Sequence, residues 1–382
     1  MSATPPDAAT EPASGPGPAP VPASLDAVPT PALVVDLDVL DRNIGRMAAF
    51  AGEGGFALRP HAKTHKCPQI AARQLAAGAA GLTVATIGEA EVFAASGARD
   101  LFIAYPLWLD EGKRARVAAL AANLPLSVGV DSAENAARLV GTGARVVIEV
   151  DSGHHRTGVA PGEAGALASA VRGLGLEVEG VFTFPGHGMA RDADADPAQV
   201  RRHAAQDQEK ALAEAADSLR AKGIEPAVIS GGSTPTAGLR EDGVINELRP
   251  GVYVFNDAMQ VALGSCALED VALRVLATVV SVPGPDRFVL DAGSKTLGAD
   301  GNAWAEGFGL VPGYPGAVIA QLSEHHAVVR LPEGARPPRH GDRVALVPNH
   351  VCNTVNLADE LYVVQDGRPV HRWPVAARGA NR

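Results

Sequence analysis

The sequence predicts an α/β fold, a (β/α)8 barrel followed by a mainly β domain, and three observations carry this prediction. Eight apolar runs of strand length recur between about residues 56 and 255, and Ala-rich segments with helical patterning separate most of them. Short apolar strands that alternate with helices indicate a parallel sheet covered on both sides. After about residue 265 the chain becomes β-rich, with Gly, Pro and Asp turns. An open doubly wound sheet is the alternative, but the glycine-rich turn of a dinucleotide site is missing from its first unit.

The predicted barrel strands are short apolar runs separated by longer segments. They are residues 56–60, 81–86, 101–105, 126–130, 145–150, 176–184, 226–232 and 251–255. Intervening segments such as GEAEVFAASGA and SAENAARLVGTG predict amphipathic helices, and TIGE predicts a capped helix start. Eight such units in about 220 residues fit a (β/α)8 barrel.

The chain divides into three predicted parts. Residues 1–25 are rich in Pro, Ala, Ser and Gly, which predicts a disordered tail. We expect residues 37–262 to form the barrel and residues 265–382 to form the β-domain. In the latter, DGRP lies between two apolar runs and predicts a hairpin turn.

Composition excludes several classes of protein. The 382 residues are 46% apolar, which gives ample core, and the net charge of −10 with no basic tract argues against a nucleic-acid surface. Three cysteines are too few for a disulfide framework, so we expect a cytoplasmic protein. No apolar run approaches the roughly 18 residues of a membrane span, and the N-terminal segment lacks the features of a signal peptide.

The stretch RPHAKTHK, residues 59–66, packs five basic side chains into eight residues of an acidic chain. Lys63 follows the first predicted strand, and the C-terminal ends of barrel strands carry the chemistry in such folds. Its neighbours His61, His65 and Lys66 are expected to lower its pKa and free its amine for a Schiff base. The alternative for an isolated lysine is a solvated surface loop.

The stretch SGGSTPT, residues 230–236, follows the seventh predicted strand and offers backbone N–H and hydroxyl groups to an anion. Phosphate sites in such barrels favour the loops after strands seven and eight, and LRPGVYVFND lies at the eighth. A lysine at one strand end that faces a phosphate cup elsewhere on the rim suits pyridoxal phosphate. The predicted cofactor-binding residues here are Gly232, Ser233, Thr234, Gly251, Val252 and Tyr253.

Two arginines follow predicted strands at the same rim. Arg156 lies in DSGHHRTGV and Arg249 in LRPGV. Each alone is compatible with a structural salt bridge. Together they are predicted to contact the pyridine nitrogen and the ring hydroxyl of the cofactor. An arginine at that nitrogen keeps its own proton, so the ring would be a weaker electron sink.

The stretch PNHVCNTVN in the β-rich region contains a candidate metal pair. His350 and Cys352 are two residues apart, and on an extended segment such side chains point the same way. Imidazole with thiolate is a zinc-type pair. Further ligands must then come from water, substrate or another side chain, and His187 in FPGHGM is a possible extra ligand or a base. A buried cysteine beside a turn histidine is the structural alternative.

Taken together, these motifs resemble those of a known enzyme family. The chain resembles the fold-type III pyridoxal-phosphate enzymes, the alanine racemase-like group, and within it the D-serine dehydratase and D-threonine aldolase branch. RPHAKTHK, SGGSTPT, RPGVYVFND and PNHVCNTVN carry the resemblance, which spans about residues 28 to 375. It implies that residues 28–36 pack with the β-domain. It also implies a homodimer with its active site at the subunit boundary.

The resemblance favours one reaction over its alternatives. A His-x-Cys pair resembles the zinc site of the dehydratases, whereas the aldolases usually carry aspartate at the second position. Cys352 therefore favours dehydration of D-serine or another 3-hydroxy-D-amino acid to a 2-oxo acid and ammonia, with Lys63 removing the Cα proton. The sequence departs from some relatives in VFTFPGHGM, where phenylalanines replace a tyrosine near the cofactor.

Other functions remain as alternatives. Retro-aldol cleavage to glycine and an aldehyde would use the same residues, with His187 as a base. A non-catalytic pyridoxal-phosphate carrier would lack the β-rich region after residue 265. A metal-only barrel hydrolase leaves Lys63 and SGGSTPT unexplained, and racemisation ranks low because its tyrosine base is not located.

Overall fold

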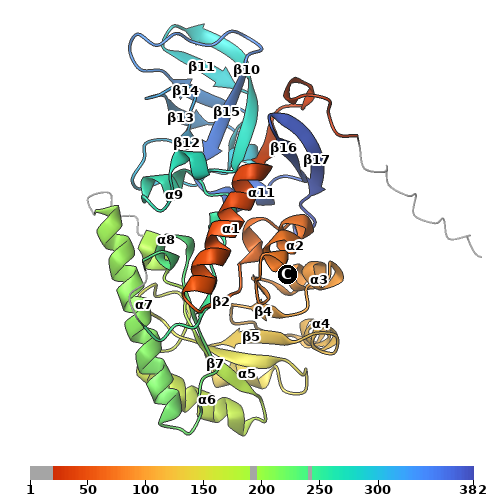
Figure 1. Ribbon diagram of the computed structural model, residues 1–382, viewed down its shortest axis with the longest axis vertical. Coiled ribbons are helices and arrows are strands. Elements are labelled where there is room, and N and C mark those ends of the chain that lie inside the picture. Colours follow the sequence, from red (N-terminus) through yellow and green to blue (C-terminus); the bar gives the residue numbers. More distant parts are fainter. Residues whose placement is uncertain (1–19, 190–195, 240–242) are drawn as a thin grey trace, which may run out of the picture.

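The computed structural model describes residues 20–189, 196–239 and 243–382, and these form two sheets (Figure 1). One sheet has eight parallel strands and the other has nine strands that are mainly antiparallel. The predicted fold class, a barrel followed by a mainly β domain, is confirmed. Most of the tail predicted for residues 1–25, namely residues 1–19, lies outside the described residues.

The eight parallel strands form a TIM-like barrel. In sheet order they run β2-β9-β8-β7-β6-β5-β4-β3. The two ends of this order meet, because Thr83 N donates to Pro60 O at 2.8 Å and His61 forms a parallel bridge with Thr83. The strands are β2 (Ala57–Leu58), β3 (Leu82–Val84), β4 (Leu101–Ile103), β5 (Leu126–Val130), β6 (Arg145–Glu149), β7 (Val178–Phe182), β8 (Val228–Gly231) and β9 (Glu247–Leu248).

Helices follow the barrel strands along the chain and pack on their outer side (Figure 1). Side-chain caps start several of them: Thr86 Oγ1 accepts from Glu89 N at 3.0 Å, as TIGE predicted. The helices of this region are α1 (Leu37–Glu53), α2 (Pro68–Ala76), α3 (Ile87–Ala95), α4 (Glu111–Ala121), α5 (Ala133–Ala137), α6 (Ala164–Gly173), α7 (Pro197–Arg220), α8 (Thr234–Ala237) and α9 (Ala258–Ala262).

The prediction of the eighth strand at residues 251–255 is wrong in position. The strand is the upstream β9, and Val252–Val254 forms a 3-10 helix, η5. Tyr253 and Phe255 are buried in the cluster that also forms the core of the β-domain. A short apolar run does not distinguish a buried strand from a buried helical turn, which is why periodicity misplaced the element.

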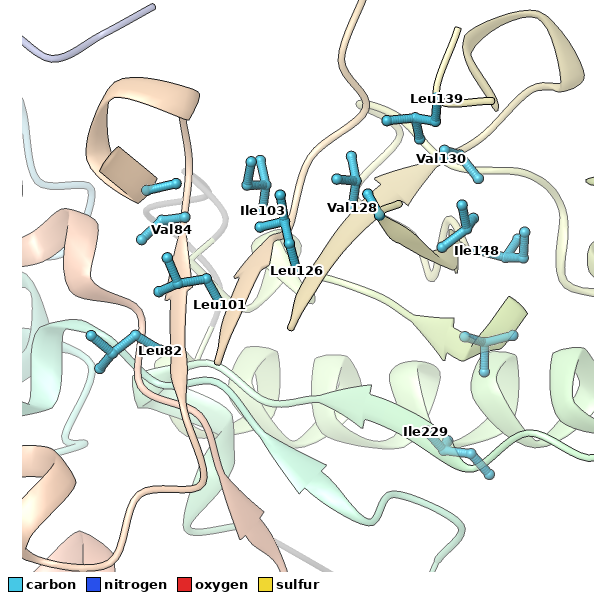
Figure 2. Packing of buried hydrophobic residues seen from close by; sticks show 14 of the residues in the cluster. Leu82, Val84, Leu101, Ile103, Leu126, Val128, Val130, Leu139, Ile148 and Ile229 are labelled. Carbon is cyan, nitrogen blue, oxygen red and sulfur yellow. The ribbon is translucent and has the colours of Figure 1, made fainter. Parts of the chain in front are cut away.

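The barrel strands separate an apolar outer layer from a more polar interior. Outward residues such as Val84, Ile103 and Val128 pack with one another and with the helices, and Figure 2 shows them standing in rows on neighbouring strands. Inside, Ser230 Oγ donates to Glu247 Oε1 at 2.7 Å. The polar groups inside the barrel are thus paired with one another, as buried polar groups in folded proteins normally are.

The second sheet is built mainly from the C-terminal third of the chain. β1 (Ala32–Asp36) joins it near the N-terminus, antiparallel to β10 and parallel to β16. Asp366 and Gly367 have positive φ and turn β16 into β17, so the predicted hairpin is confirmed. The other elements are β10 (Leu273–Gly284), β11 (Arg287–Leu290), β12 (Gly309–Leu310), β13 (Val318–Leu322), β14 (Ala327–Arg330), β15 (Arg343–Pro348), β16 (Glu360–Gln365), β17 (Arg368–Pro374), α10 (Ser294–Leu297) and α11 (Val351–Asn356).

Within the described residues, no helix combines the length and the apolar character that crossing a membrane requires.

Candidate active site

A cavity of about 250 Å³ lies where the barrel mouth meets the β-domain. Both regions contribute to its wall, so residues that are far apart in the sequence face one another here. The predicted site residues in its wall are Lys63, Ser233, Thr234, Arg249, Gly251, Val252, His350 and Cys352. His61, Thr64, Phe184, Met189, Pro235, Asp257, Met259 and Gln260 complete the wall.

Lys63 lies in a single 3-10 turn, η2 (Ala62–Thr64), that directly follows the first barrel strand. Its Nζ lies 5.6 Å from the centre of the Phe184 ring. Burial lowers the pKa of Lys63, and the guanidinium groups of Arg156 and Arg249 add to this effect against the opposing charges of Cys352 and Glu89. The shift has the direction that the sequence predicted, and it increases the fraction of nucleophilic free amine.

The basic neighbours named in the sequence are not the main cause of that shift. Burial lowers the pKa of His65 to about 4 and that of His61 well below its usual value, so both rings are neutral at pH 7. The Nζ of Lys66 instead lies 3.4 Å from Glu89 Oε1, in a buried ion pair. Local sequence showed the positive charges of this stretch but not their burial or their partners.

The predicted phosphate cup is formed by the loop before α8 and the turn into η5. Gly232 N donates to Gln208 Oε1 at 2.9 Å and Ser233 N donates to Thr236 Oγ1 at 2.9 Å, so these two amides are already engaged. Among the described residues, the backbone N–H groups of Thr234, Gly251 and Val252 donate no hydrogen bond. These three amides are therefore available to an anion in the cavity.

Gly251 permits a close approach between the cup and the lysine loop. A Cβ atom at this position would lie 2.7 Å from Thr64 Oγ1 and 3.1 Å from His61 O. Only glycine fits without displacing the loop that carries Lys63. Tyr253 contributes its backbone and not its side chain to the predicted cup. Its N–H donates to Thr234 Oγ1 at 3.0 Å, whereas its phenol oxygen accepts from Gln74 in the core.

The two arginines occupy different environments. Arg249 is buried: its Nε donates to Ser230 Oγ at 2.7 Å, and the guanidinium lies 5.1 Å from the centre of the Phe182 ring. Burial lowers its pKa to about 10. Arg156 is exposed and lies beside the Phe184 ring at 5.3 Å, next to the cavity rather than in its wall.

His350 and Cys352 are adjacent in the wall of the cavity. The local backbone differs from the extended segment that spacing predicted, because His350 is the N-cap of α11 and Cys352 lies in its first turn. Burial opposes a charge on His350, but contacts with Cys352, Asp257 and Asp300 outweigh it and raise the pKa of His350 to about 10. The Sγ of Cys352 also lies 3.3 Å from Thr64 Oγ1.

Asp300 and Asp257 support this pair, and sequence analysis missed both. Asp300 Oδ2 lies 2.8 Å from His350 Nδ1, which orients the ring through this nitrogen and leaves Nε2 as the other possible ligand atom. Asp257 Oδ2 accepts from Val351 N at 3.0 Å, and burial raises the pKa of Asp257 to about 6. Their distance in sequence from His350 left no local signal by which to find them.

His187 is not brought to this cavity. It lies in a 3-10 turn, η4 (Gly186–Met189), after β7, and its Nε2 is 3.2 Å from Asp207 Oδ2. Met189 of the same turn does line the cavity. Within the described ranges, no group of three or more His, Cys, Asp or Glu side chains has the geometry of a metal site. A metal here would therefore rest on the pair and on non-protein ligands.

The residues of the cavity fit pyridoxal phosphate, and the imidazole–thiol pair offers two ligand atoms of the kind that zinc prefers. A lysine with a lowered pKa shares the cavity wall with three backbone N–H groups that lack a partner in the described part of the fold and with the imidazole–thiol pair. The buried Nδ1 of His61 in the same wall has no hydrogen-bond partner among the described residues. Buried polar atoms in folded proteins are normally paired, so an unpaired one in a cavity wall marks a place for a bound molecule.

Family comparisons agree with this geometry. Residues 35–258 match the family model of the alanine racemase N-terminal domain. The chain belongs to this family of fold-type III pyridoxal-phosphate enzymes. In this pyridoxal-phosphate enzyme, residues 272–364 also match the putative serine dehydratase domain.

Curated relatives cover nearly the whole chain. It is 39% identical to a D-threonine aldolase of Arthrobacter sp over 370 residues, which cover 94% of this chain and 95% of the relative. It is 36% identical to the D-threo-3-hydroxyaspartate dehydratase of Delftia sp. (strain HT23), over 87% of this chain and 93% of that one. The relatives thus include both reactions that the sequence left open.

The similar solved structures also include both an aldolase and a dehydratase. The D-threonine aldolase of Filomicrobium marinum superposes with a TM-score of 0.83 at 32% identity, over 95% of this chain and 99% of that one. The dehydratase of Delftia superposes with a TM-score of 0.85 at 32% identity, over 92% and 98%. Its solved forms include a cysteine-to-alanine mutant in the metal-free form and a histidine-to-alanine mutant, and the two positions are two residues apart.

Proposed function

We propose that this enzyme is a metal-dependent lyase that dehydrates D-serine or another 3-hydroxy-D-amino acid to a 2-oxo acid and ammonia. One observation carries the proposal: the imidazole of His350 and the thiol of Cys352 share a cavity with Lys63. The dehydratase of Delftia supports it, because the histidine and the cysteine mutated there have the same spacing.

In this proposal each group has one task. Lys63 would hold pyridoxal phosphate covalently, and the amides of Thr234, Gly251 and Val252 would receive its phosphate. The cofactor supplies an electron sink for the charge that develops at Cα. The amine of Lys63 would remove the Cα proton of the bound substrate, which its lowered pKa favours at neutral pH.

The leaving hydroxyl needs separate help, because hydroxide is a poor leaving group. His350 and Cys352 would hold a divalent metal, zinc in our proposal, which supplies Lewis-acid chemistry to the 3-hydroxyl. Asp300 keeps the His350 ring oriented for this task. Loss of water from the substrate leaves an enamine, which hydrolyses to the 2-oxo acid and ammonia.

Retro-aldol cleavage is the second candidate, and the identity to the aldolase of Arthrobacter favours it. It would yield glycine and an aldehyde, and needs a base at the 3-hydroxyl rather than a leaving group. His187, our candidate base, bonds Asp207 and does not line the cavity, so the geometry offers less support for this reaction.

Homodimer formation stays a prediction.

Chelation tests the proposal. Purified enzyme loaded with pyridoxal phosphate is stripped of metal, assayed for 2-oxo acid with D-serine and with D-threo-3-hydroxyaspartate, and then reloaded with zinc. We expect activity to disappear on stripping and to return with zinc, and Cys352→Ala to resemble the stripped enzyme. Full oxo-acid formation without metal would overturn the metal role, and absence of turnover on any D-3-hydroxy amino acid would favour a carrier.

A further inference from the structure

The contact between the lysine loop and the β-domain depends on a buried charge that plays no part in the proposed reaction. We propose that Lys66 is a positioning residue that fixes the loop of Lys63 against α11, and that the C-terminal segment, residues 375–382, completes this fixation through Asn381. The inference rests on the proposed function, since it concerns how the proposed cofactor lysine and metal pair are held relative to each other.

The ammonium of Lys66 is buried at the centre of a polar cluster, one member of which, Asn381, is exposed. Its Nζ donates to Asn356 Oδ1 at 2.7 Å and to Asn381 Oδ1 at 3.0 Å, and lies 3.4 Å from Glu89 Oε1. Only 5% of Lys66 and 2% of Glu89 are exposed. A buried charge is costly unless it is paired and hydrogen-bonded, so this ammonium stays where its partners are. The partners come from α3, from α11 and from the end of the chain.

Helix α11 touches the lysine loop at two points. Cys352 contacts Thr64, and Asn356 contacts Lys66. Residues four apart share one face of a helix, so a single face of α11 holds both contacts. Thr64 directly follows Lys63 in the chain. The metal pair and the cofactor lysine are thereby joined through short, direct contacts.

The backbone of Lys66 needs this anchoring. Its φ of 49° lies in the left-handed region, which a side chain other than glycine rarely adopts. Such a conformation is strained and persists only where the surroundings hold it. The ion pair with Glu89 and the two amide contacts hold it here. Without them the loop would relax and Lys63 would move with it.

The C-terminal segment leaves the β-domain after β17 and docks on the barrel, and Figure 1 shows the chain end beside α2 and α3. Ala377 N donates to Lys66 O at 3.1 Å, and Thr86 Oγ1 donates to Ala380 O at 2.5 Å. At Gly88 a Cβ atom would lie 2.9 Å from Arg382 O, so glycine admits the segment there. The segment is thus built into the barrel beside the lysine loop, where it presents Asn381 to Lys66.

The test compares substitutions that differ only in the acceptor. Asn381→Leu keeps the approximate shape of the side chain and removes the oxygen, whereas Asn381→Asp keeps an oxygen for Lys66. Arg378→Ala is the matched control, since Arg378 lies on the same segment but pairs with exposed Asp359. Each variant is measured for its apparent Kd for zinc, for the visible absorbance of lysine-bound cofactor and for Tm.

We expect Asn381→Leu to weaken zinc binding and cofactor attachment by roughly 2- to 30-fold, the range that a side-chain network remote from a ligand commonly contributes. Asn381→Asp should restore most of the loss, and Arg378→Ala should match the unaltered enzyme. Zinc affinity and cofactor absorbance in Asn381→Leu equal to those of the unaltered enzyme would overturn the inference.

Hydrogen exchange separates this inference from the proposed function. Exchange at residues 62–67 reports the lysine loop directly in protein that carries neither cofactor nor metal. Faster exchange there in Asn381→Leu but not in Arg378→Ala supports the inference, and equal exchange in both contradicts it. Unaltered protein that fails to load cofactor or zinc contradicts the proposed function alone.

Discussion

The Sγ of Cys352 lies 3.3 Å from the hydroxyl of Thr64, the residue next to Lys63. This contact joins the β-domain to the first barrel loop and places a thiol beside a lysine of lowered pKa. Three features surround this contact: the burial of Lys63, the carboxylate of Asp300 beside His350, and the close approach of Gly251 to Thr64.

Lys63 is expected to be essential for cofactor attachment. In Lys63→Ala the visible absorbance of lysine-bound cofactor should vanish, and turnover should fall by at least roughly 100- to 10,000-fold, the usual contribution of a positioned proton-transfer group. Lys295→Ala, which alters an exposed lysine paired with Glu324, should leave both unchanged. Retention of the absorbance band in Lys63→Ala would refute the assignment.

The close approach at Gly251 predicts a steric effect on the cofactor site. Gly251→Ala places a Cβ atom 2.7 Å from Thr64 Oγ1 and so pushes the cup away from the lysine loop. Overpacking of this kind costs about 1–3 kcal/mol. We expect weaker binding of pyridoxal phosphate in an equilibrium titration. Gly238→Ala is the control, because nothing lies within 4 Å of a Cβ atom there.

Asp300 is expected to govern metal affinity through His350. Asp300→Asn removes the charge that holds the His350 ring at 2.8 Å. Loss of such an outer partner typically costs about 10- to 100-fold in metal affinity. Competition with a metal indicator measures the change, and Glu306→Gln, at an exposed ion pair with Arg330, serves as the control. Equal zinc affinity in both variants would exclude this role of Asp300.

The buried His65 predicts a pH dependence of stability. The pKa of His65 is about 4 in the folded chain and about 6.5 in the unfolded chain. Between these values the unfolded chain takes up a proton that the folded chain does not, so the free energy of unfolding falls as the pH falls from 6.5 to 4. The contribution is at most about 3 kcal/mol.

Urea unfolding at several pH values measures this dependence. His65→Gln should show a shallower fall of the unfolding free energy below pH 6.5, and His203→Gln, at an exposed position, should keep the original slope. Identical slopes in His65→Gln and the unaltered enzyme would show that His65 is not the titrating group. His61, whose pKa burial also lowers, would then be the next candidate.

Local sequence patterns carried much of the fold and of the site. Seven of the eight predicted barrel strands overlap strands of the structure, because each short apolar run is bounded by turn residues. Lys63, Ser233 and Thr234 could be found from their place just after such runs. His350 and Cys352 could be found from their spacing, although the backbone there is a helix cap and not a strand.

The remainder depended on contacts between distant segments. Glu89 and Asn381 meet Lys66 only in the fold, and their places in the sequence give no sign of it. Asp300 likewise reaches His350 from another loop. Burial also overturned one expectation: the sequence predicted that His61 is a cationic neighbour of Lys63, whereas burial lowers the pKa of His61 well below its usual value and leaves the ring neutral at pH 7. Propensity and spacing describe single elements, whereas these effects arise from packing between elements.

One assay with D-threonine tests the central claim most directly. Zinc-loaded enzyme carrying pyridoxal phosphate is incubated with D-threonine, and the same sample is analysed for 2-oxobutanoate with ammonia and for glycine with acetaldehyde. The proposed dehydration predicts 2-oxobutanoate and ammonia in equal amounts, lost on chelation and restored by zinc. Glycine and acetaldehyde as the products would contradict it and identify the enzyme as an aldolase despite Cys352.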